Sequence, residues 1–279
     1  MALARALRVV GLMNVQFAIK DDEIYLIEVN PRASRTVPFV AKATDSAIAS
    51  IAARIMAGEP LSNFPLREGY AADTDYDTTD VPMADPMTLA DPNMPWYSVK
   101  EAVLPFARFP GVDTILGPEM RSTGEVMGWD RSFPRAFLKA QMGAGTHLPT
   151  EGNVFFSIKD ADKTDQMIEA AQVLSGMGFK LIATGGTAKF LEAAGIACEV
   201  VKKVYEGRPN VVDMMKDGGI QLVLNTTEGA ASVEDSREIR SVALYDKIPY
   251  YTTAAGAHAA VMAMRSREEG EIVVKSLQG

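Results

Sequence analysis

A short segment, residues 24–36 (IYLIEVNPRASRT), combines strand-forming residues with side chains that bind metal ions and phosphate. Its aliphatic and aromatic residues predict a buried strand. Side chains alternate faces along a strand, so Glu28 and Asn30 should point to the same face. Their oxygens suit a hard divalent cation, and the guanidinium groups of Arg32 and Arg35 suit a phosphate ester. The segment therefore predicts a site for a metal ion and a phosphate.

The preceding segment, residues 11–20 (GLMNVQFAIK), predicts a second strand, and the acidic residues 21–23 predict a hairpin turn between the two. The register of this hairpin decides whether Gln16 joins the site. A two-residue loop would pair Gln16 with Ile27, whereas a three-residue or bulged loop would place it opposite Glu28. We expect the second arrangement.

Strand and helix patterns alternate from about residue 153 onward. This alternation predicts a parallel sheet with helices on both faces, and a ligand at the carboxyl ends of its strands. The expected strands are 154–158, 179–184, 198–201, 221–226, 249–253 and 272–276. The expected helices are 164–175, 188–194, 211–216, 237–245 and 255–264.

Polar residues collect after three of these strands: Thr184 to Thr187 (TGGT), Asn225 to Thr227, and Tyr250 with Thr252 and Thr253. A Thr-Gly-Gly-Thr turn that opens a helix offers hydroxyl and backbone N–H donors to a phosphate, and Lys203 adds charge. Any one cluster could instead serve as a helix cap or turn. Three clusters at three strand ends favour a shared pocket.

Length and composition suggest two domains, 1–150 and 151–279, joined by a glycine- and proline-rich hinge at 143–152. We also expect a helix over 37–58, short strands near 103–106 and 125–128, a helix over 132–142, and an acidic surface loop over 61–96. The net charge of −8 argues against a nucleic-acid surface. A single cysteine, Cys198, fits a reducing compartment and so a cytoplasmic location, and no apolar run could span a membrane.

Residues 11–44, together with SVKEAVLPFARFPGVD at 98–113 and GPEMRSTGEVMG at 117–128, resemble the end of the second ATP-grasp unit in the carbamoyl-phosphate synthase large-subunit family. The resemblance implies that Gln16, Glu28 and Asn30 hold the magnesium or manganese ions that bridge the ATP phosphates. It places Arg32 beside the transferred phosphoryl group as the catalytic residue. Without the resemblance, a structural Glu–Asn pair at a strand end would be an equally good interpretation.

The second half, through YEGRPNVVD at 205–213, NTTEG at 225–229 and YYTTAAGA at 250–257, resembles the methylglyoxal-synthase-like effector domain of the same subunit. The resemblance implies a pocket for a nucleoside monophosphate, with UMP as inhibitor and IMP as activator. The matching positions are Thr184, Thr187, Lys203, Asn225 and Thr227. Lys163 lies one position out of register with a further family lysine. Tyr250, Thr252 and Glu101 match part of an ornithine site, whose other acidic ligands would precede Met1.

The resemblance implies a C-terminal part of an oligomeric ligase that makes carbamoyl phosphate for pyrimidine and arginine biosynthesis from bicarbonate, two ATP, and ammonia from a glutaminase small subunit. The ATP-binding lobes would precede Met1, so we expect this portion to be inactive alone. One alternative is a stand-alone nucleotide-sensing module. Another is a methylglyoxal-synthase-type lyase, which we disfavour because Arg208, in the turn 207–209, replaces the catalytic Asp that abstracts a proton.

Overall fold

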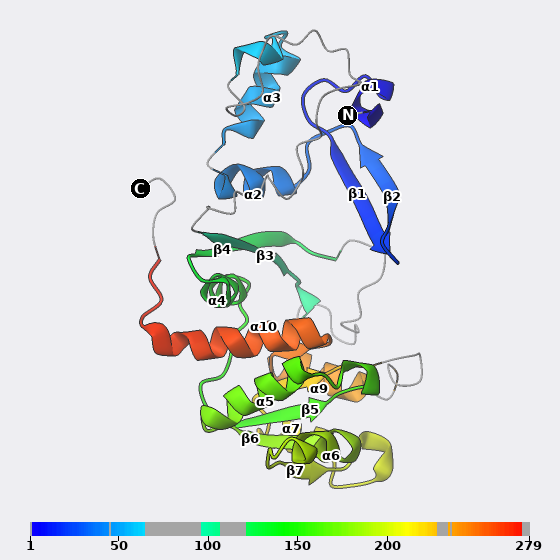
Figure 1. The fold of residues 1–279 in the computed structure, drawn as a ribbon, viewed down its shortest axis with the longest axis vertical. Coiled ribbons are helices and arrows are strands. Elements are labelled where there is room, and N and C mark those ends of the chain that lie inside the picture. The colour runs from blue at the N-terminus through cyan, green and yellow to red at the C-terminus, as the bar shows by residue number, and fades with distance from the viewer. Residues whose placement is uncertain are drawn as a thin grey trace. The chain divides into compact units, whose positions relative to one another are not determined.

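The computed structural model describes residues 2–44, 46–64, 96–106, 121–227, 234 and 236–274 (Figure 1). It divides into two compact units: unit 1 is Met1–Asn93 with Lys275–Gly279, and unit 2 is Met94–Val274. Among the described residues, no helix is both long enough and apolar enough to cross a membrane.

Unit 1 consists of a β-hairpin and short helices. Its elements are α1 (Ala2–Ala6), β1 (Asn14–Lys20), β2 (Glu23–Asn30), α2 (Thr36–Ala43), α3 (Ile48–Met56) and the 3-10 turn η1 (Leu61–Asn63). The predicted helix over 37–58 is in fact two helices. The hydroxyl of Thr44 donates to the carbonyl of Val40 at 2.8 Å, a local bond typical of residues that end helices. Gly58, at φ +97°, follows α3 and ends it as expected.

The hairpin contains a β-bulge that sets the register of the predicted metal site. Its turn has two residues, Asp21 and Asp22, both at positive φ, so that Lys20 faces Glu23. The ladder then shifts by one residue between Gln16 and Phe17, and Gln16 pairs with Glu28. The expected pairing is therefore confirmed, but the extra residue lies in the ladder and not in the loop.

The prediction that residues 24–29 are buried is wrong. Ile24 is 69% exposed and Ile27 is 63% exposed, and Phe17 and Ile19 on β1 are also exposed. Within the described part of unit 1, β1 and β2 form a two-stranded sheet. Such a hairpin leaves both faces open unless another layer packs on it, so an apolar sequence alone did not decide burial.

Unit 2 begins with an antiparallel strand pair, β3 (Tyr97–Val103) and β4 (Gly124–Asp130), followed by α4 (Phe133–Gly143). The predicted helix at 132–142 is confirmed, whereas the first strand lies earlier than the predicted 103–106. The remaining strands are β5 (Asn153–Ser157), β6 (Lys180–Thr184), β7 (Glu199–Val201), β8 (Leu222–Asn225) and β9 (Tyr250–Tyr251). The helices are α5 (Asp165–Gly176), α6 (Gly185–Ala193), α7 (Val211–Lys216), α9 (Arg237–Tyr245) and α10 (Ala254–Arg265), with 3-10 turns η4 (Asp160–Asp162), η5 (Val204–Glu206) and η6 (Ser266–Glu269).

Strands β5 to β9 form one parallel sheet in the order β7-β6-β5-β8-β9. Val154 and Phe156 face a core built with α5, α6 and α10, whereas Phe155 faces a second core with α7 and α9. This alternation covers both faces of the sheet and confirms the doubly wound fold. The chain runs from β5 outward to β7 and then crosses to β8 on the other side of β5. A crevice between these two connections opens at the carboxyl ends of β5 and β8.

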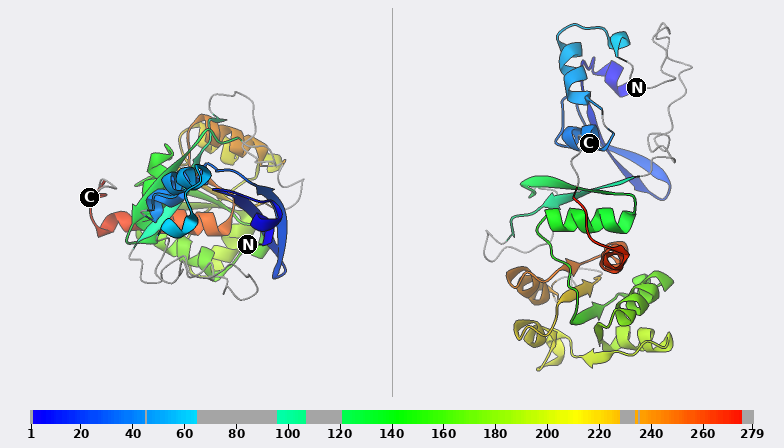
Figure 2. Two further views of the ribbon diagram at one scale, coloured as in Figure 1. Left: turned by 90° about the horizontal axis from the view of Figure 1, so that it is seen from above. Right: turned by 90° about the vertical axis from the view of Figure 1, so that its left-hand side faces the viewer.

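The β3–β4 pair and α4 belong to the same compact unit as the parallel sheet. Figure 2 shows α4 between this strand pair and α10, and Leu138 of α4 joins the core that contains α10. The boundary between the two compact units therefore lies well before residue 150, because the apolar face of α4 is buried against the second half of the chain. The limits 1–150 and 151–279 stay a prediction about sequence domains.

The predicted last strand does not form over its described residues, Ile272–Val274. The backbone just before these residues is hydrogen-bonded by Arg135 of α4 instead of by a neighbouring strand. The Arg135 guanidinium donates to the carbonyl oxygens of Ser266, Gly270 and Glu271, the last at 2.6 Å. The rest of that prediction, residues 275–276, and most of the predicted acidic loop, residues 65–95, lie outside the described residues.

Candidate functional site

The hairpin of unit 1 brings three predicted metal ligands to one face. Gln16 lies opposite Glu28, and Asn30 lies two residues further along β2. The Asn30 amide donates to the Glu28 carboxylate at 2.8 Å, and the Arg32 guanidinium lies 3.5 Å from the Asn30 side-chain oxygen. Arg32 also donates to the carbonyl of Ala33 at 3.1 Å. The four side chains therefore form a continuous polar row.

A second site lies at the crevice of the parallel sheet. A cavity of about 50 Å³ is lined by Ser157 of β5, Thr184 at the end of β6, Asn225 of β8 and Lys203 after β7. Ser157 and Asn225 are partners in the parallel ladder, so they end their strands side by side. Thr184 and Asn225 are almost fully buried. Three of the predicted effector residues thus meet in one cavity. The cavity lies at the point where the strand order changes direction, as is usual for ligand sites of doubly wound sheets.

Thr187 supports this cavity from within the fold. Its hydroxyl accepts the backbone N–H of Ile158 at 2.9 Å and the hydroxyl of Thr184 at 3.2 Å, and the residue is 1% exposed. The Thr226 hydroxyl likewise accepts the backbone N–H of Lys159. The other predicted threonines, Thr227 and Thr252, are half-buried and exposed respectively.

Of two lysines near the cavity, Lys203 lines it, whereas Lys163 lies beside the Thr-Gly-Gly-Thr turn and is paired with Asp160. The Lys163 ammonium lies 3.1 Å from the carbonyl oxygen of Gly186, inside the Thr-Gly-Gly-Thr turn, and 2.6 Å from the carboxylate of Asp160. The hydrogen bond and charge of Lys163, together with the charge of Lys203, lower the pKa of Asp160. The structure therefore places Lys163 beside the turn despite its register in the sequence.

Adjacent tyrosines on β9 point to opposite sides of the sheet. The Tyr250 hydroxyl accepts the side-chain amide of Asn225 at 2.7 Å, so Tyr250 holds a residue that lines the cavity without lining it itself. Tyr251 instead donates to Gln141 of α4 at 3.0 Å, and Gln141 donates to Glu101 of β3 at 2.8 Å. Glu101 is thus connected to Tyr251, and sequence reasoning missed Gln141 and Tyr251 because polar residues inside helix or strand patterns carry no motif.

Burial affects the acid–base behaviour of this hydrogen-bonded chain. Burial raises the pKa of Glu101, and the hydrogen bond from Gln141 offsets only part of that rise. Burial and then the nearby Glu101 charge raise the pKa of Tyr251. The folded state therefore disfavours the ionised form of Glu101.

Comparisons with known proteins cover both units. Residues 1–64 match the family model described as the ATP-binding domain of the carbamoyl-phosphate synthase L chain, and residues 166–252 match the MGS-like domain. The carbamoyl phosphate synthase large chain of Rhizobium meliloti is 53% identical over 99% of this chain and 22% of its own length. The large chain of Pasteurella multocida is 50% identical over 97% of this chain and 23% of its own length.

The resemblance to carbamoyl phosphate synthase large chains is confirmed. The matched residues include the polar row on β1 and β2 and most of the cavity at the parallel sheet. The chain spans about a fifth of the length of these carbamoyl phosphate synthase relatives.

Arg208, in the MGS-like domain, has a structural partner. Its guanidinium lies 3.5 Å from the carboxylate of Asp213 on α7, and its side chain is 77% exposed. Asp213 also accepts the N–H of Asn210, which caps α7. The cation therefore occupies a surface ion pair and offers no proton acceptor to a substrate.

A Glu101→Gln substitution should stabilise the fold in a pH-dependent manner. The unfolded chain releases the Glu101 proton at lower pH than the folded chain, so ionisation lowers stability as pH rises through and above the ordinary range of glutamate. We expect Glu101→Gln to raise the melting temperature at pH 7 and to have no effect at about pH 3, below that range. A Glu151→Gln control, at an exposed position, should show no such pH dependence. Equal shifts at both pH values would contradict the burial effect.

Proposed function

We propose that this chain forms part of a carbamoyl phosphate synthase large chain and carries two of its sites. One would contribute metal and phosphate contacts for the phosphorylation of carbamate, within the synthesis of carbamoyl phosphate from bicarbonate, glutamine-derived ammonia and two ATP. The other would bind a regulatory nucleotide. Identity of about half of the residues along nearly the whole chain supports this assignment.

The observation that carries the regulatory site is the meeting of Thr184, Lys203 and Asn225 around one cavity. Buried hydroxyl and amide groups beside an ammonium group favour an anion, and the nearby N-terminus of α6 adds backbone N–H groups. The cavity is small compared with a whole nucleotide. It therefore suits the phosphate of a monophosphate such as UMP or IMP.

The polar row of unit 1 supports the assignment of Mg²⁺ or Mn²⁺ and ATP. Gln16, Glu28 and Asn30 provide oxygen atoms, which these hard cations prefer. Within the described residues no group of three or more carboxylate, His or Cys side chains lies together, so phosphate oxygens and water would complete the coordination. When bound, such a metal ion neutralises charge on the transferred phosphoryl group. Arg32 would orient the same group from the end of the row.

Further partners of the assembled enzyme follow from the family. We propose a glutaminase small subunit as the source of ammonia, an oligomeric assembly, and a cytoplasmic location. The single cysteine, Cys198, supports the last point, because a chain with one cysteine forms no internal disulfide and so fits a reducing compartment. Ornithine is a weaker candidate ligand, because two side chains expected to bind it belong to separate hydrogen-bond networks. Tyr250 bonds Asn225, whereas Glu101 bonds Gln141.

Calorimetric titration of the chain with UMP and then with IMP tests the regulatory site. Binding of either nucleotide that inorganic phosphate competes away would support a phosphate-centred effector pocket. Absence of binding by both nucleotides and by phosphate would reject the regulatory assignment for this chain, while the metal assignment would remain testable separately.

A Glu28→Gln substitution tests the metal assignment. We expect the chain to bind Mn²⁺, measured by the loss of its free electron paramagnetic resonance signal, and expect the substitution to weaken binding about tenfold or more, because it removes the only charged ligand of the row. Glu23→Gln is a matched control, because Glu23 lies on the same strand but bonds Tyr25. Equal effects of both substitutions would reject Glu28 as a ligand.

A further inference from the structure

Strand β9 consists of two tyrosines, and each belongs to a different hydrogen-bond network. Tyr250 packs with the core that includes α7 and α9, whereas Tyr251 packs with the core that includes α5, α6 and α10. The strand lies at the edge of the described sheet, where its two residues pair with Val223 and Leu224 of β8. So short an edge strand has few backbone hydrogen bonds to hold it. A displacement of one tyrosine therefore also moves the other.

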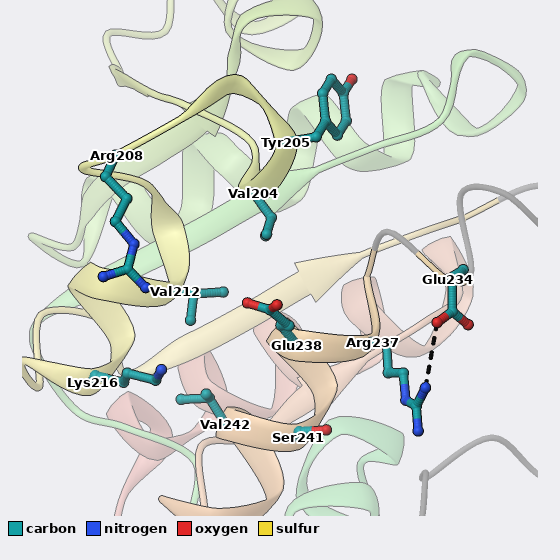
Figure 3. A pocket seen from close by; sticks show the side chains of 10 residues that line it. All are labelled: Val204, Tyr205, Arg208, Val212, Lys216, Glu234, Arg237, Glu238, Ser241 and Val242. Carbon is teal, nitrogen blue, oxygen red and sulfur yellow. Dashed lines mark hydrogen bonds and ion pairs between the residues drawn. The ribbon is translucent and has the colours of Figure 1, made fainter.

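The network of Tyr250 leads to the cavity at the parallel sheet. Its hydroxyl accepts the side-chain amide of Asn225, which lines the cavity and is 1% exposed. Neither tyrosine of β9 lines this cavity or the larger groove beside it, which is lined from η5, α7 and α9 (Figure 3). An anion in the cavity attracts the N–H groups of Asn225 and so competes with Tyr250 for them. A ligand in the cavity thus acts on β9 through Asn225.

The network of Tyr251 runs in the opposite direction, to β3. Tyr251 donates to the side-chain oxygen of Gln141, and the amide nitrogen of Gln141 donates to Glu101. An ionised carboxylate only accepts hydrogen bonds, so the N–H side of Gln141 must face Glu101 and its oxygen must face a donor. Burial raises the pKa of Tyr251, which keeps its hydroxyl protonated as that donor. Gln141 is 5% exposed, so loss of Tyr251 would leave a buried carbonyl group unpaired.

Helix α4 connects this network to both strands of the β3–β4 pair. Gln141 on α4 bonds Glu101 of β3. On the same helix, Lys139 donates to the backbone carbonyl of Trp129 in β4 at 3.1 Å. The strand pair is therefore tethered to the edge of the parallel sheet through α4 and Tyr251.

We propose that β9 couples occupation of the cavity to the mobility of the β3–β4 strand pair. An anionic ligand that recruits the Asn225 amide displaces Tyr250. The adjacent Tyr251 then leaves Gln141, and the hold on Glu101 is lost. This inference rests on the proposed effector site and adds a route by which that site acts; Tyr251 and Gln141 are positioning residues. Because the tether opposes binding, linkage requires that breaking it by substitution strengthens binding.

Hydrogen–deuterium exchange of residues 97–103, measured by mass spectrometry with and without UMP, tests this coupling. We expect saturation with UMP to speed amide exchange in β3 about fivefold, the lower end of the usual coupling between sites. Tyr251→Phe keeps the ring and removes the hydroxyl. Without ligand it should exchange at the rate of the UMP-bound wild type, and calorimetry should show about fivefold tighter UMP binding. Tyr245→Phe, which removes a hydroxyl from a residue that is 88% exposed, should behave as the wild type.

The affinity measurement separates coupling from a structural role. Gln141→Met keeps the side-chain length but removes both hydrogen bonds, and it should reproduce the tighter binding of Tyr251→Phe. Faster exchange in these variants with unchanged or weaker UMP binding would overturn the coupling and leave the effector site intact. Unchanged exchange of β3 in a wild type that binds UMP would do the same. Failure of the wild type to bind both UMP and inorganic phosphate would overturn the effector site and this inference with it.

Discussion

Replacement of Gly128 by alanine should lower the free energy of unfolding of unit 2 by about 3 kcal/mol, because the added methyl group has no space. A Cβ built on Gly128 overlaps the carbonyl oxygen of Ala136 and lies 2.5 Å from the amide nitrogen of Ala140. Both atoms belong to the backbone of α4, so no side-chain rotation relieves the overlap. Because α4 also packs on α10, a shift of the helix disturbs the main core. We therefore expect a loss at the upper end of the usual range for overpacking.

Urea denaturation followed by tryptophan fluorescence measures this loss, because both tryptophans, Trp96 and Trp129, lie in unit 2. Gly124→Ala is the matched control on the same strand. A Cβ there lies 3.9 Å from the nearest atom, the Cβ of Val103, and its addition should change stability by less than about 0.5 kcal/mol. Equal midpoints for the two variants would show that β4 and α4 are less closely packed than the structure has them.

The parallel sheet was the most predictable part of the fold. Helices α7 and α9 begin and end at the predicted residues, because capping and apolar spacing agree there. Asn210, for example, accepts the N–H groups of Val212 and Asp213 and so starts α7. Where local preference and tertiary packing favour the same structure, sequence patterns are sufficient.

The errors occurred where the outcome depends on distant partners. The apolar residues of β2 carry the pattern of a buried strand, but burial requires a second layer that a strand cannot specify by itself. Residues 272–274 also have strand-forming side chains, yet Arg135 of α4 bonds the carbonyl oxygens that precede them. A contact across more than 130 residues cannot be inferred from local spacing.

The candidate sites show the same division. The three polar clusters could be assigned to strand ends from the sequence, and parallel topology then brought Thr184 and Asn225 to one cavity. The role of Thr187 was less predictable, because its hydroxyl holds the backbone of Ile158 and does not line the cavity. Thr187→Ala would therefore leave a buried N–H group unpaired, and its effect on binding could not be separated from its effect on folding.

Lys203→Ala is the sharper test of the phosphate site, because Lys203 lines the cavity and is only half-buried. Its ammonium lies 5.6 Å from the ring centre of Tyr205, which also lines the cavity. A charge-assisted hydrogen bond to phosphate contributes about 1.5–3 kcal/mol, so the substitution should weaken UMP binding about 10- to 100-fold. Calorimetry at two salt concentrations measures the loss. The affinity of the wild type should also fall more steeply with salt than that of the variant.

Lys202→Ala controls for net charge, because Lys202 is the exposed neighbour of Lys203 and does not line the cavity. Both substitutions remove one positive charge from the same segment, so a long-range effect of charge would weaken binding equally in both. A loss confined to Lys203→Ala would assign the effect to direct contact with the phosphate. Unchanged UMP affinity in Lys203→Ala would instead require that Lys163, beside the Thr-Gly-Gly-Thr turn, supplies the charge, and Lys163→Ala would then have to produce the same loss.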